Sequence, residues 1–408
     1  MNRFSAAAAL AATLLIWPRV GSAQENALTL DRALQLARER APDIVSARSR
    51  IGEAQGRLVG ASVLLRENPV LESAGGRRSS ARGDFLDGNV GLIQTFELGG
   101  HRGARIANAE ADVARAEAVS EDVTRRLLRD VSTAFLGVLF ADEQGRLART
   151  SESVATEILR TAERRLQAGD IPRLDVNLSQ AALSRARSDL RATEARHLAA
   201  LGQLRILLGM DVDAPLAVLG DLKDRRRYDL VDLIGRAPDR ADLKALAAER
   251  RGADADIGLG DAVAWPNLGL GVKYAREEEA NVLLGTLTLS LPVFERGQGL
   301  RAEAGARSRR LSLELEAGHK IVRVEVRTAF DVYQRRVEAV EELERNALPL
   351  LDSNEALARR SYESGQLALA DLLVVRREVV GTRLEYFDRL LEAATAGVEL
   401  EANAGVLR

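Results

Sequence analysis

The sequence contains no cysteine, and its other metal-ligating side chains are sparse. Without cysteine there is neither a disulfide framework nor a residue to carry a lipid anchor at an export cleavage site. The only histidines, His101, His197 and His319, lie far apart, and Met210 is the only methionine after Met1. No spacing typical of a metal site exists. We therefore expect no bound metal and no lipid anchor, and we expect His101, at a helix start, to face solvent.

Signatures of catalysis and of nucleotide binding are also lacking. The segments Gly258-Leu259-Gly260 and Gly297-Gln298-Gly299 do not form the strand-loop-helix fingerprint of a phosphate site. Acidic pairs such as Glu341-Glu342 are more typical of solvated helix faces than of acid–base dyads. The net charge of −2 favours no polyanionic partner. We predict that the protein is not an enzyme, uses no cofactor and binds no nucleic acid.

Long apolar runs are missing except near the start of the chain. An apolar stretch from Phe4 to Trp17 follows Arg3 and precedes Gly21-Ser22-Ala23, a small-x-small cleavage pattern. This pattern predicts a signal peptide over residues 1–23 and a mature chain that begins at Gln24 beyond the inner membrane. No later stretch approaches the about 20 apolar residues of a membrane-spanning helix. Attachment to a membrane must therefore come from the folded protein.

Internal repetition is the most informative feature that is present. Arg40-Ala41-Pro42-Asp43 recurs as Arg236-Ala237-Pro238-Asp239, and Thr133-Ala134-Phe135 recurs as Thr328-Ala329-Phe330. Single residues repeat at nearly the same offset: Pro69 with Pro266, Gly100 with Gly297, Gly169 with Gly365, and Asp175 with Asp371. Such self-similarity indicates a duplicated structural unit. We predict two repeats, residues 24–213 and 214–408.

Each repeat is predicted to contain short helices, two strands, a very long helix and a returning helix. The long helices are expected over about 101–168 and 298–364, and the returning helices over about 172–210 and 367–405. A helix of the first length extends roughly 100 Å, too long for a globule. Apolar residues recur every seven positions, which predicts coiled-coil seams: Leu127, Val131, Ala134, Val138, Ala141 and Ala148, then Val326, Tyr333, Val340 and Ala347. Pro349, where the first repeat has Ser153, predicts a kink.

Two segments in each repeat alternate between apolar and polar residues and are predicted to be strands, at about 68–77, 88–98, 266–276 and 282–294. The clearest has Leu268, Leu270, Val272 and Tyr274 on one face. A soluble sheet with one buried face would show the same alternation. Strands of about ten residues in an exported chain with oversized helices instead favour a transmembrane barrel.

Four strands cannot close a barrel, and open strand edges in lipid leave costly unpaired backbone groups. Several chains must therefore share one barrel. About eight strands give an interior filled by side chains, and an open lumen needs more. Twelve strands from three chains is the smallest assembly of this kind that conducts.

The strand-to-helix joins, Gln94-Thr95-Phe96-Glu97-Leu98-Gly99-Gly100-His101-Arg102 and Leu291-Pro292-Val293-Phe294-Glu295-Arg296-Gly297-Gln298-Gly299, give the chain its resemblance to a known family. With the duplication, they resemble the TolC-type outer membrane efflux proteins over essentially the whole mature chain, and the branch serving cobalt-zinc-cadmium and copper-silver resistance pumps. The resemblance implies a homotrimer: a twelve-stranded β-barrel in outer-membrane lipid, continuous with a periplasmic α-helical barrel. It also implies an equatorial belt from the short helices near 28–40 and 228–237.

The same resemblance implies partners and a gate. The chain would be the passive exit channel of a tripartite system, with a periplasmic adaptor and an inner-membrane pump of the RND type. Its gate would lie at the periplasmic helix turns, with Gly169, Asp175, Tyr362, Gly365 and Asp371. Glycine suits a turn that needs positive φ, with Pro172 at the first position of the returning helix.

Two aspartates and two substitutions at the predicted gate allow more than one interpretation of how it works. Six carboxylates around one opening would favour cations, whereas an aspartate in a first helical turn also simply complements the helix dipole. Leu367 and Val374 replace an arginine and a second aspartate of TolC itself, so its ionic latch does not carry over.

Three functions are compatible with the sequence. The first is a duct for heavy-metal cations, and the second is a drug-efflux or type I secretion duct of the same fold. The third is a periplasmic coiled-coil adaptor or scaffold, which would have one hairpin between small β-rich domains. Two long hairpins alternating with two strand pairs favour a duct.

Overall fold

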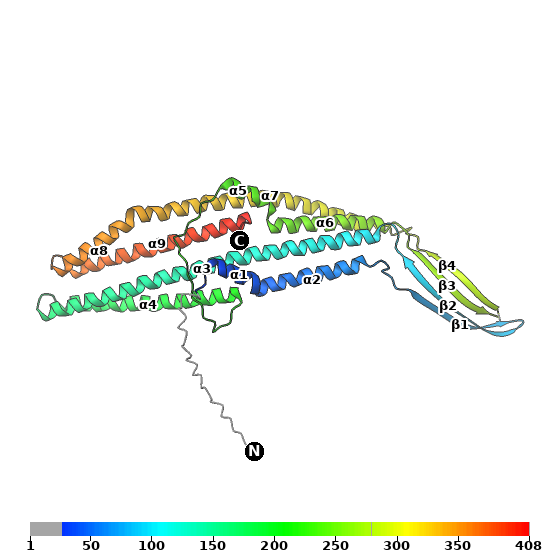
Figure 1. The fold of residues 1–408 in the computed structure, drawn as a ribbon, viewed down its shortest axis with the longest axis horizontal. Helices are drawn as coiled ribbons and strands as arrows, with labels where there is room; N and C mark the ends of the chain where they lie inside the picture. Colours follow the sequence, from blue (N-terminus) through cyan, green and yellow to red (C-terminus); the bar gives the residue numbers. More distant parts are fainter. Residues whose placement is uncertain (1–26, 279, 408) are drawn as a thin grey trace, which may run out of the picture.

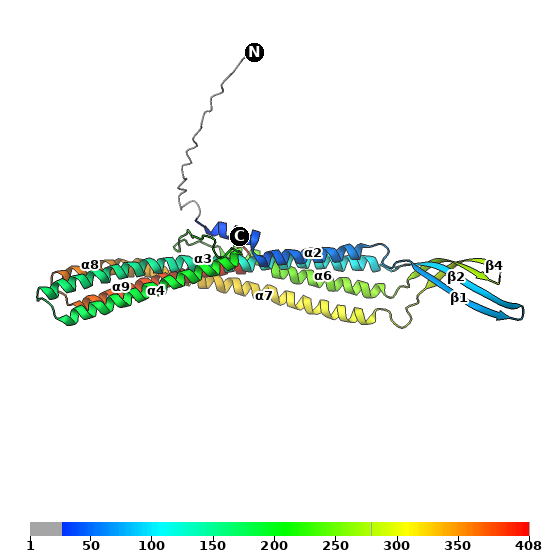
Figure 2. The ribbon, with the colours of Figure 1, turned by 90° about the horizontal axis from the view of Figure 1, so that it is seen from below.

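The computed structural model describes residues 27–278 and 280–407 as a long, narrow rod (Figure 1). The predicted signal peptide, residues 1–23, lies outside the described residues. Strands occupy one end, two helical hairpins occupy the other, and short helices lie near the middle (Figures 1 and 2). The predicted combination of long helices and four antiparallel strands is confirmed.

Both halves of the chain present the same order of elements. The first half contains α1 (Leu30–Arg40), α2 (Pro42–Ser62), β1 (Val70–Ser80), β2 (Gly83–Phe96), α3 (His101–Gln167) and α4 (Arg173–Leu208). The second contains α5 (Leu230–Arg236), the 3₁₀ turn η1 (Ala237–Asp239), α6 (Ala241–Ala262), β3 (Leu268–Glu277), β4 (Ala280–Leu289), α7 (Gln298–Glu342), the π-helical turn η2 (Leu343–Ala347), α8 (Leu348–Glu363) and α9 (Leu369–Ala404).

The second long helix is not continuous, as the kink predicted at Pro349 indicated. A π-helical turn, Leu343–Ala347, separates α7 from α8, and Pro349 lies in the first turn of α8. Proline has no N–H to donate and its ring clashes with the preceding turn, so the helix is interrupted there. The corresponding long helix of the first half, α3, is uninterrupted and extends over 67 residues.

The first hairpin differs from its prediction. A polar loop was expected between residues 77 and 88, but both strands continue through it to a turn at Ala81 and Arg82. Cross-strand ion pairs explain the extension, because Arg77 pairs with Asp84 and Arg78 pairs with Asp87. Opposite charges on neighbouring strands stabilise strand pairing in this segment, although its charged and small residues have low β-propensity.

The four strands form one antiparallel sheet in the order β1-β2-β3-β4. Register places Tyr274 opposite both Val90 and Leu283, and Leu270 opposite Leu287. The apolar side chains predicted for separate strands therefore share one face, which stays exposed in the single chain. Leu283 and Leu287 are 73% and 71% exposed. β4 ends at Leu289, short of the predicted end near residue 294, and Pro292, which cannot donate to a ladder, lies three residues further on.

The helices form a curved wall. Toward the strands α3 packs against α2 and α6, and α6 packs against α7; toward the tips α3 packs against α4, and α9 packs against α7 and α8. The predicted seams are its core, because Val131, Val138, Val326 and Val340 are fully buried. Helices α2 and α4 form one edge of this wall and α7 and α8 form the other (Figure 1).

A buried arginine ties three elements of the second half together near the middle of the rod. The Arg240 guanidinium donates to both carboxylate oxygens of Asp242 at 2.8 Å, to Glu325 at 2.7 Å and to the backbone oxygen of Asn403 at 3.2 Å. Its side chain is 8% exposed. The two carboxylates raise the pKa of Arg240 although burial opposes the charge.

Replacing Arg240 by alanine is expected to lower the free energy of unfolding by about 2 kcal/mol, because it leaves the Asn403 carbonyl and two partly exposed carboxylates without their buried donor. Urea titration of the detergent-solubilised protein, followed by far-UV circular dichroism, measures the change. The matched control is Arg327→Ala, whose ion pair with Asp331 is solvent-exposed and worth about 0.3 kcal/mol. Equal midpoints for the two variants would contradict the structural role of Arg240.

Candidate functional site

The two helical hairpins end in turns of matching geometry. Gly169 and Gly365 adopt φ of +83° and +77°, the left-handed region that side chains other than glycine rarely enter. Each turn closes with a backbone bond back into the preceding helix, from Asp170 N to Arg165 O at 2.9 Å and from Gln366 N to Ser361 O at 2.8 Å. The structure thus gives a physical reason for both glycines. Pro172 is the N-cap of α4, one position earlier than predicted.

An arginine from the first hairpin is bound to a tyrosine of the second. The Arg165 guanidinium carbon lies 5.3 Å from the centre of the Tyr362 ring, and Arg165 Nη1 donates to Tyr362 O at 3.2 Å. Tyr362 is 3% exposed and belongs to an apolar cluster with Ala358, Leu369 and Leu372. Arg165 is half-buried, and a cation over an aromatic face binds more strongly as it is removed from water. We call this contact the Arg165–Tyr362 clasp.

One predicted aspartate, Asp175, influences the charge state of Tyr362 in the clasp. Burial raises the pKa of Tyr362, the charge of Arg165 opposes that rise, and the charge of Asp175 adds to it. Asp175 is half-buried in the first turn of α4, where its carbonyl accepts from Ser179 at 2.9 Å. Two of the predicted site residues, Asp175 and Tyr362, are therefore close enough across the hairpins to interact electrostatically. Gly365 lies beside Arg165, since a Cβ added at this glycine would lie 3.7 Å from Arg165 Nη2.

The remaining predicted residues lie apart from this contact. Asp371 is exposed in the first turn of α9. Leu367, in place of an arginine, packs against the apolar cluster around Tyr362. Val374, in place of an aspartate, is 63% exposed. An ionic latch at these two positions is therefore replaced by an apolar contact and an exposed valine.

Sequence reasoning did not identify Arg165. The duplication gives little help in finding Arg165. The equivalent position in the second half is Ser361, so the arginine is not repeated. The partner of Arg165 lies in the other hairpin, almost two hundred positions away. Neither helical periodicity nor a local motif connects them.

The histidines have local roles. His101 is half-buried and its Nδ1 lies 2.6 Å from the backbone oxygen of Leu98. The expectation that it faces solvent is met only in part, because the half-buried ring binds the backbone that links β2 to α3. Over residues 27–278 and 280–407, no group of three or more His, Cys, Asp or Glu side chains is placed to hold a metal ion. Over the same residues, no helix combines the length and apolar character needed to cross a membrane.

Comparisons with known proteins agree with this architecture. The family described as "Outer membrane efflux protein" matches residues 33–210. The chain is 25% identical to the cobalt-zinc-cadmium resistance protein CzcC of Cupriavidus metallidurans, over 93% of this chain and 90% of that protein. It is 29% identical to the pyoverdine export outer membrane protein OpmQ of Pseudomonas aeruginosa, over 78% and 71%. The fold is similar to a crystal structure of CusC, with a TM-score of 0.79 and 17% sequence identity. The superposition covers 92% of this chain and 91% of the CusC chain.

Proposed function

Since the chain belongs to the outer membrane efflux protein family and is an efflux channel of the outer membrane, we propose that it acts as a homotrimer. The trimer is the passive exit duct of a tripartite system for heavy-metal cations. Residues 24–213 and 214–408 are its two efflux repeats in each chain. As a channel of this family the protein is not an enzyme.

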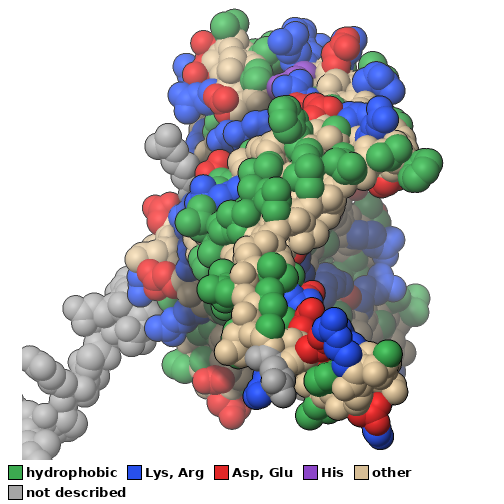
Figure 3. Space-filling view, turned by 90° about the vertical axis from the view of Figure 1, so that its right-hand side faces the viewer, with side chains coloured by type: hydrophobic (Ala, Val, Ile, Leu, Met, Phe, Trp, Pro, Cys, Tyr) green, Lys and Arg blue, Asp and Glu red, His purple; other side chains and the backbone are tan. Residues whose placement is uncertain are grey.

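The trimer is supported by the unpaired edges of the single chain. β1 and β4 each have one neighbouring strand, and unpaired edges are not tolerated in lipid. The edges of the helical wall, α2 and α4 on one side and α7 and α8 on the other, carry exposed large apolar side chains: Val45, Val59, Leu198, Ile206, Leu313, Ile321, Val324, Leu350 and Leu357. Figure 3 shows hydrophobic side chains over the strand end as well. Neighbouring copies that join both kinds of edge would form one continuous tube.

The tips are the part of the tube that faces the periplasm. We assign them to the gate and to contact with a periplasmic adaptor, which connects the duct to an inner-membrane pump of the RND type. The gate consists of Gly169, Asp175, Tyr362, Gly365 and Asp371, with Arg165 added by the clasp. The observation that carries this assignment is that the clasp joins the two hairpins within one chain. Opening the tube requires the hairpins to separate.

Heavy-metal cations are the proposed cargo because CzcC, a cobalt-zinc-cadmium resistance protein, aligns with nearly the whole chain. Similarity to a pyoverdine exporter favours a second candidate, an organic siderophore or drug-like cargo. Deleting the gene and testing growth with zinc, cobalt, cadmium, nickel, copper and several drugs separates the two. We expect sensitivity to divalent metals. Sensitivity confined to drugs, or to neither class, would reject the metal assignment.

Replacing Asp371 by alanine is expected to lower the preference of the open duct for cations by roughly a factor of a few, because three exposed carboxylates are lost at the tip. Reversal potentials in planar bilayers under a potassium chloride gradient measure this preference. The control is Glu378→Ala, another exposed carboxylate of α9 two turns further along the helix. A selectivity equal to that of the control would assign Asp371 to the helix dipole alone.

A further inference from the structure

The outer end of the sheet contains a hollow that conduction does not require. It has a volume of about 730 Å³ and lies over β1, β2 and β3. Register places Gly75 opposite Gly88, and Gly88 opposite Arg276. A Cβ added at either glycine would have only one neighbour within 4 Å, a backbone oxygen at 3.8 or 3.7 Å. The hollow therefore exists because two facing positions carry no side chain.

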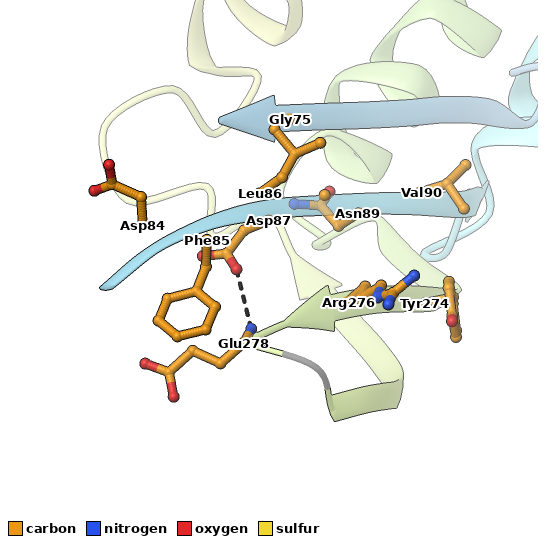
Figure 4. A pocket seen from close by; sticks show the side chains of 11 residues that line it. Gly75, Asp84, Phe85, Leu86, Asp87, Asn89, Val90, Tyr274, Arg276 and Glu278 are labelled. Atoms are coloured by element: carbon orange, nitrogen blue, oxygen red, sulfur yellow. Dashed lines mark hydrogen bonds between the residues drawn. The ribbon is translucent and has the colours of Figure 1, made fainter. Parts of the chain in front are cut away.

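Most of the residues that line the hollow lie on the apolar face of the sheet, and Phe85, Asp87, Asn89 and Glu278 line it from the other. Leu86, Val90, Tyr274 and Arg276 line it and share the apolar face by strand alternation and register. Figure 4 shows Leu86 on one side of β2 and Phe85 and Asp87 on the other. On a trimeric barrel the apolar face is the one that contacts lipid. The inference thus rests on the proposed function.

Two of the three acidic residues that line the hollow, Asp87 and Glu278, are held by Arg78 on the opposite face. The Asp87 carboxylate accepts from Arg78 Nε at 2.6 Å and from the backbone N–H of Glu278 at 3.1 Å (Figure 4). Glu278 has a φ of 53°, a left-handed conformation that this bond helps to hold. Asp87 lines the hollow with its carboxylate on the opposite face, where Arg78 balances its charge. The acidic residue on the outward face, Asp84, is paired with Arg77.

The outward residues of β3 change character in the order expected at a membrane boundary. Leu270 and Val272 are followed by Tyr274 and then by Arg276, all exposed. An apolar band, an aromatic hydroxyl and then a cation mark the passage from acyl chains to headgroups. Guanidinium binds phosphate through two parallel hydrogen bonds, and apolar walls favour an amphiphile over a free anion.

We propose that this hollow binds the phosphorylated headgroup of an outer-leaflet lipid. Arg276 contacts the phosphate, and Val90 and Tyr274, one step nearer the bilayer core by register, contact the first part of the acyl chains. Arg77 lies on the same face, opposite Leu86, and its side chain is 74% exposed. Its charge is balanced by Asp84, so the phosphate contact depends on Arg276.

The test uses the full mature trimer in detergent, titrated with diphosphoryl lipid A and read by native mass spectrometry. Arg276→Gln removes the charge, and Gly88→Leu fills the hollow in a strand where a Cβ meets no closer atom than 3.7 Å. Arg276→Gln is expected to weaken binding about tenfold, the effect of losing one good charge-assisted pair. Gly88→Leu is expected to weaken it about as much, because the leucine side chain occupies the hollow. Lys273→Gln is the matched control, because Lys273 lies on the same strand but on the inner face.

The outcomes separate this inference from the function on which it rests. Lipid A stripped of both phosphates should bind wild type and Arg276→Gln equally. Equal affinity of all variants for diphosphoryl lipid A, in trimers that still conduct, overturns the lipid site alone. Displacement of the lipid by inorganic phosphate at matched concentration also overturns it, in favour of a free-anion site. A wild-type chain that forms no conducting trimer overturns both.

Discussion

Replacing Gly297 by alanine is expected to abolish assembly of the duct in the outer membrane. Gly297 precedes α7 with a φ of +74°, and a Cβ there would lie 2.0 Å from the backbone oxygen of Gly260 in α6. The obstructing atom belongs to the backbone of a helix, so no side-chain rotation relieves the clash. We expect a loss of more than about 3 kcal/mol, at the upper end of single-substitution effects.

The duplication provides the control for this variant. Gly100 is the equivalent glycine before α3 and has a φ of +87°, but a Cβ there meets nothing within 4 Å. Gly100→Ala should therefore cost only about 1 kcal/mol of left-handed strain. The amount of trimer in the outer-membrane fraction measures both variants. Normal trimer from Gly297→Ala would show that α6 and α7 do not approach each other as described.

Replacing Arg165 by methionine is expected to open the duct. Methionine keeps an unbranched apolar side chain but removes the cation over Tyr362 and the bond to its carbonyl. The closed form loses about 2 kcal/mol in each chain, so the ratio of open to closed channels rises more than about tenfold. Single-channel recording in planar bilayers measures this ratio.

Two further variants show which atoms hold the tip closed. Arg164→Met alters the neighbouring exposed arginine, which contacts Thr161 of its own helix, and should leave the open fraction unchanged. Tyr362→Phe keeps the ring, and the hydroxyl that it removes has no hydrogen-bond partner among the described residues. It should therefore also leave gating unchanged. An open channel from Tyr362→Phe, or a closed one from Arg165→Met, would contradict the clasp.

The fold was predictable to the extent that it follows from periodicity. Heptad spacing identified Val131, Val138 and Val340 as core residues, because a buried helical seam imposes its period on the sequence. Alternation identified Leu270 and Leu287 as members of one apolar face for the same reason. In each case many residues repeat one constraint, so the pattern is legible without coordinates.

Single contacts between distant segments were not predictable. The repeat pairs Gly100 with Gly297, yet an added Cβ would clash with a neighbouring backbone only at Gly297. In the first half the tight position is Gly99, where an added Cβ would clash with the side chain of Trp265. Arg165 has no local pattern because its partner lies in the other hairpin. The first β-hairpin was predicted too short, because the ion pair of Arg78 with Asp87 depends on a register that the sequence alone does not specify.

The central claim is that one chain supplies only part of a tube and that sister copies complete it. The most direct test is to isolate the mature protein from cell fractions, determine its mass by light scattering in detergent and record its conductance in a planar bilayer. We predict a protein in the outer-membrane fraction that needs detergent, has the mass of three chains and conducts. A stable monomer in the soluble periplasmic fraction, with no conductance, would contradict it.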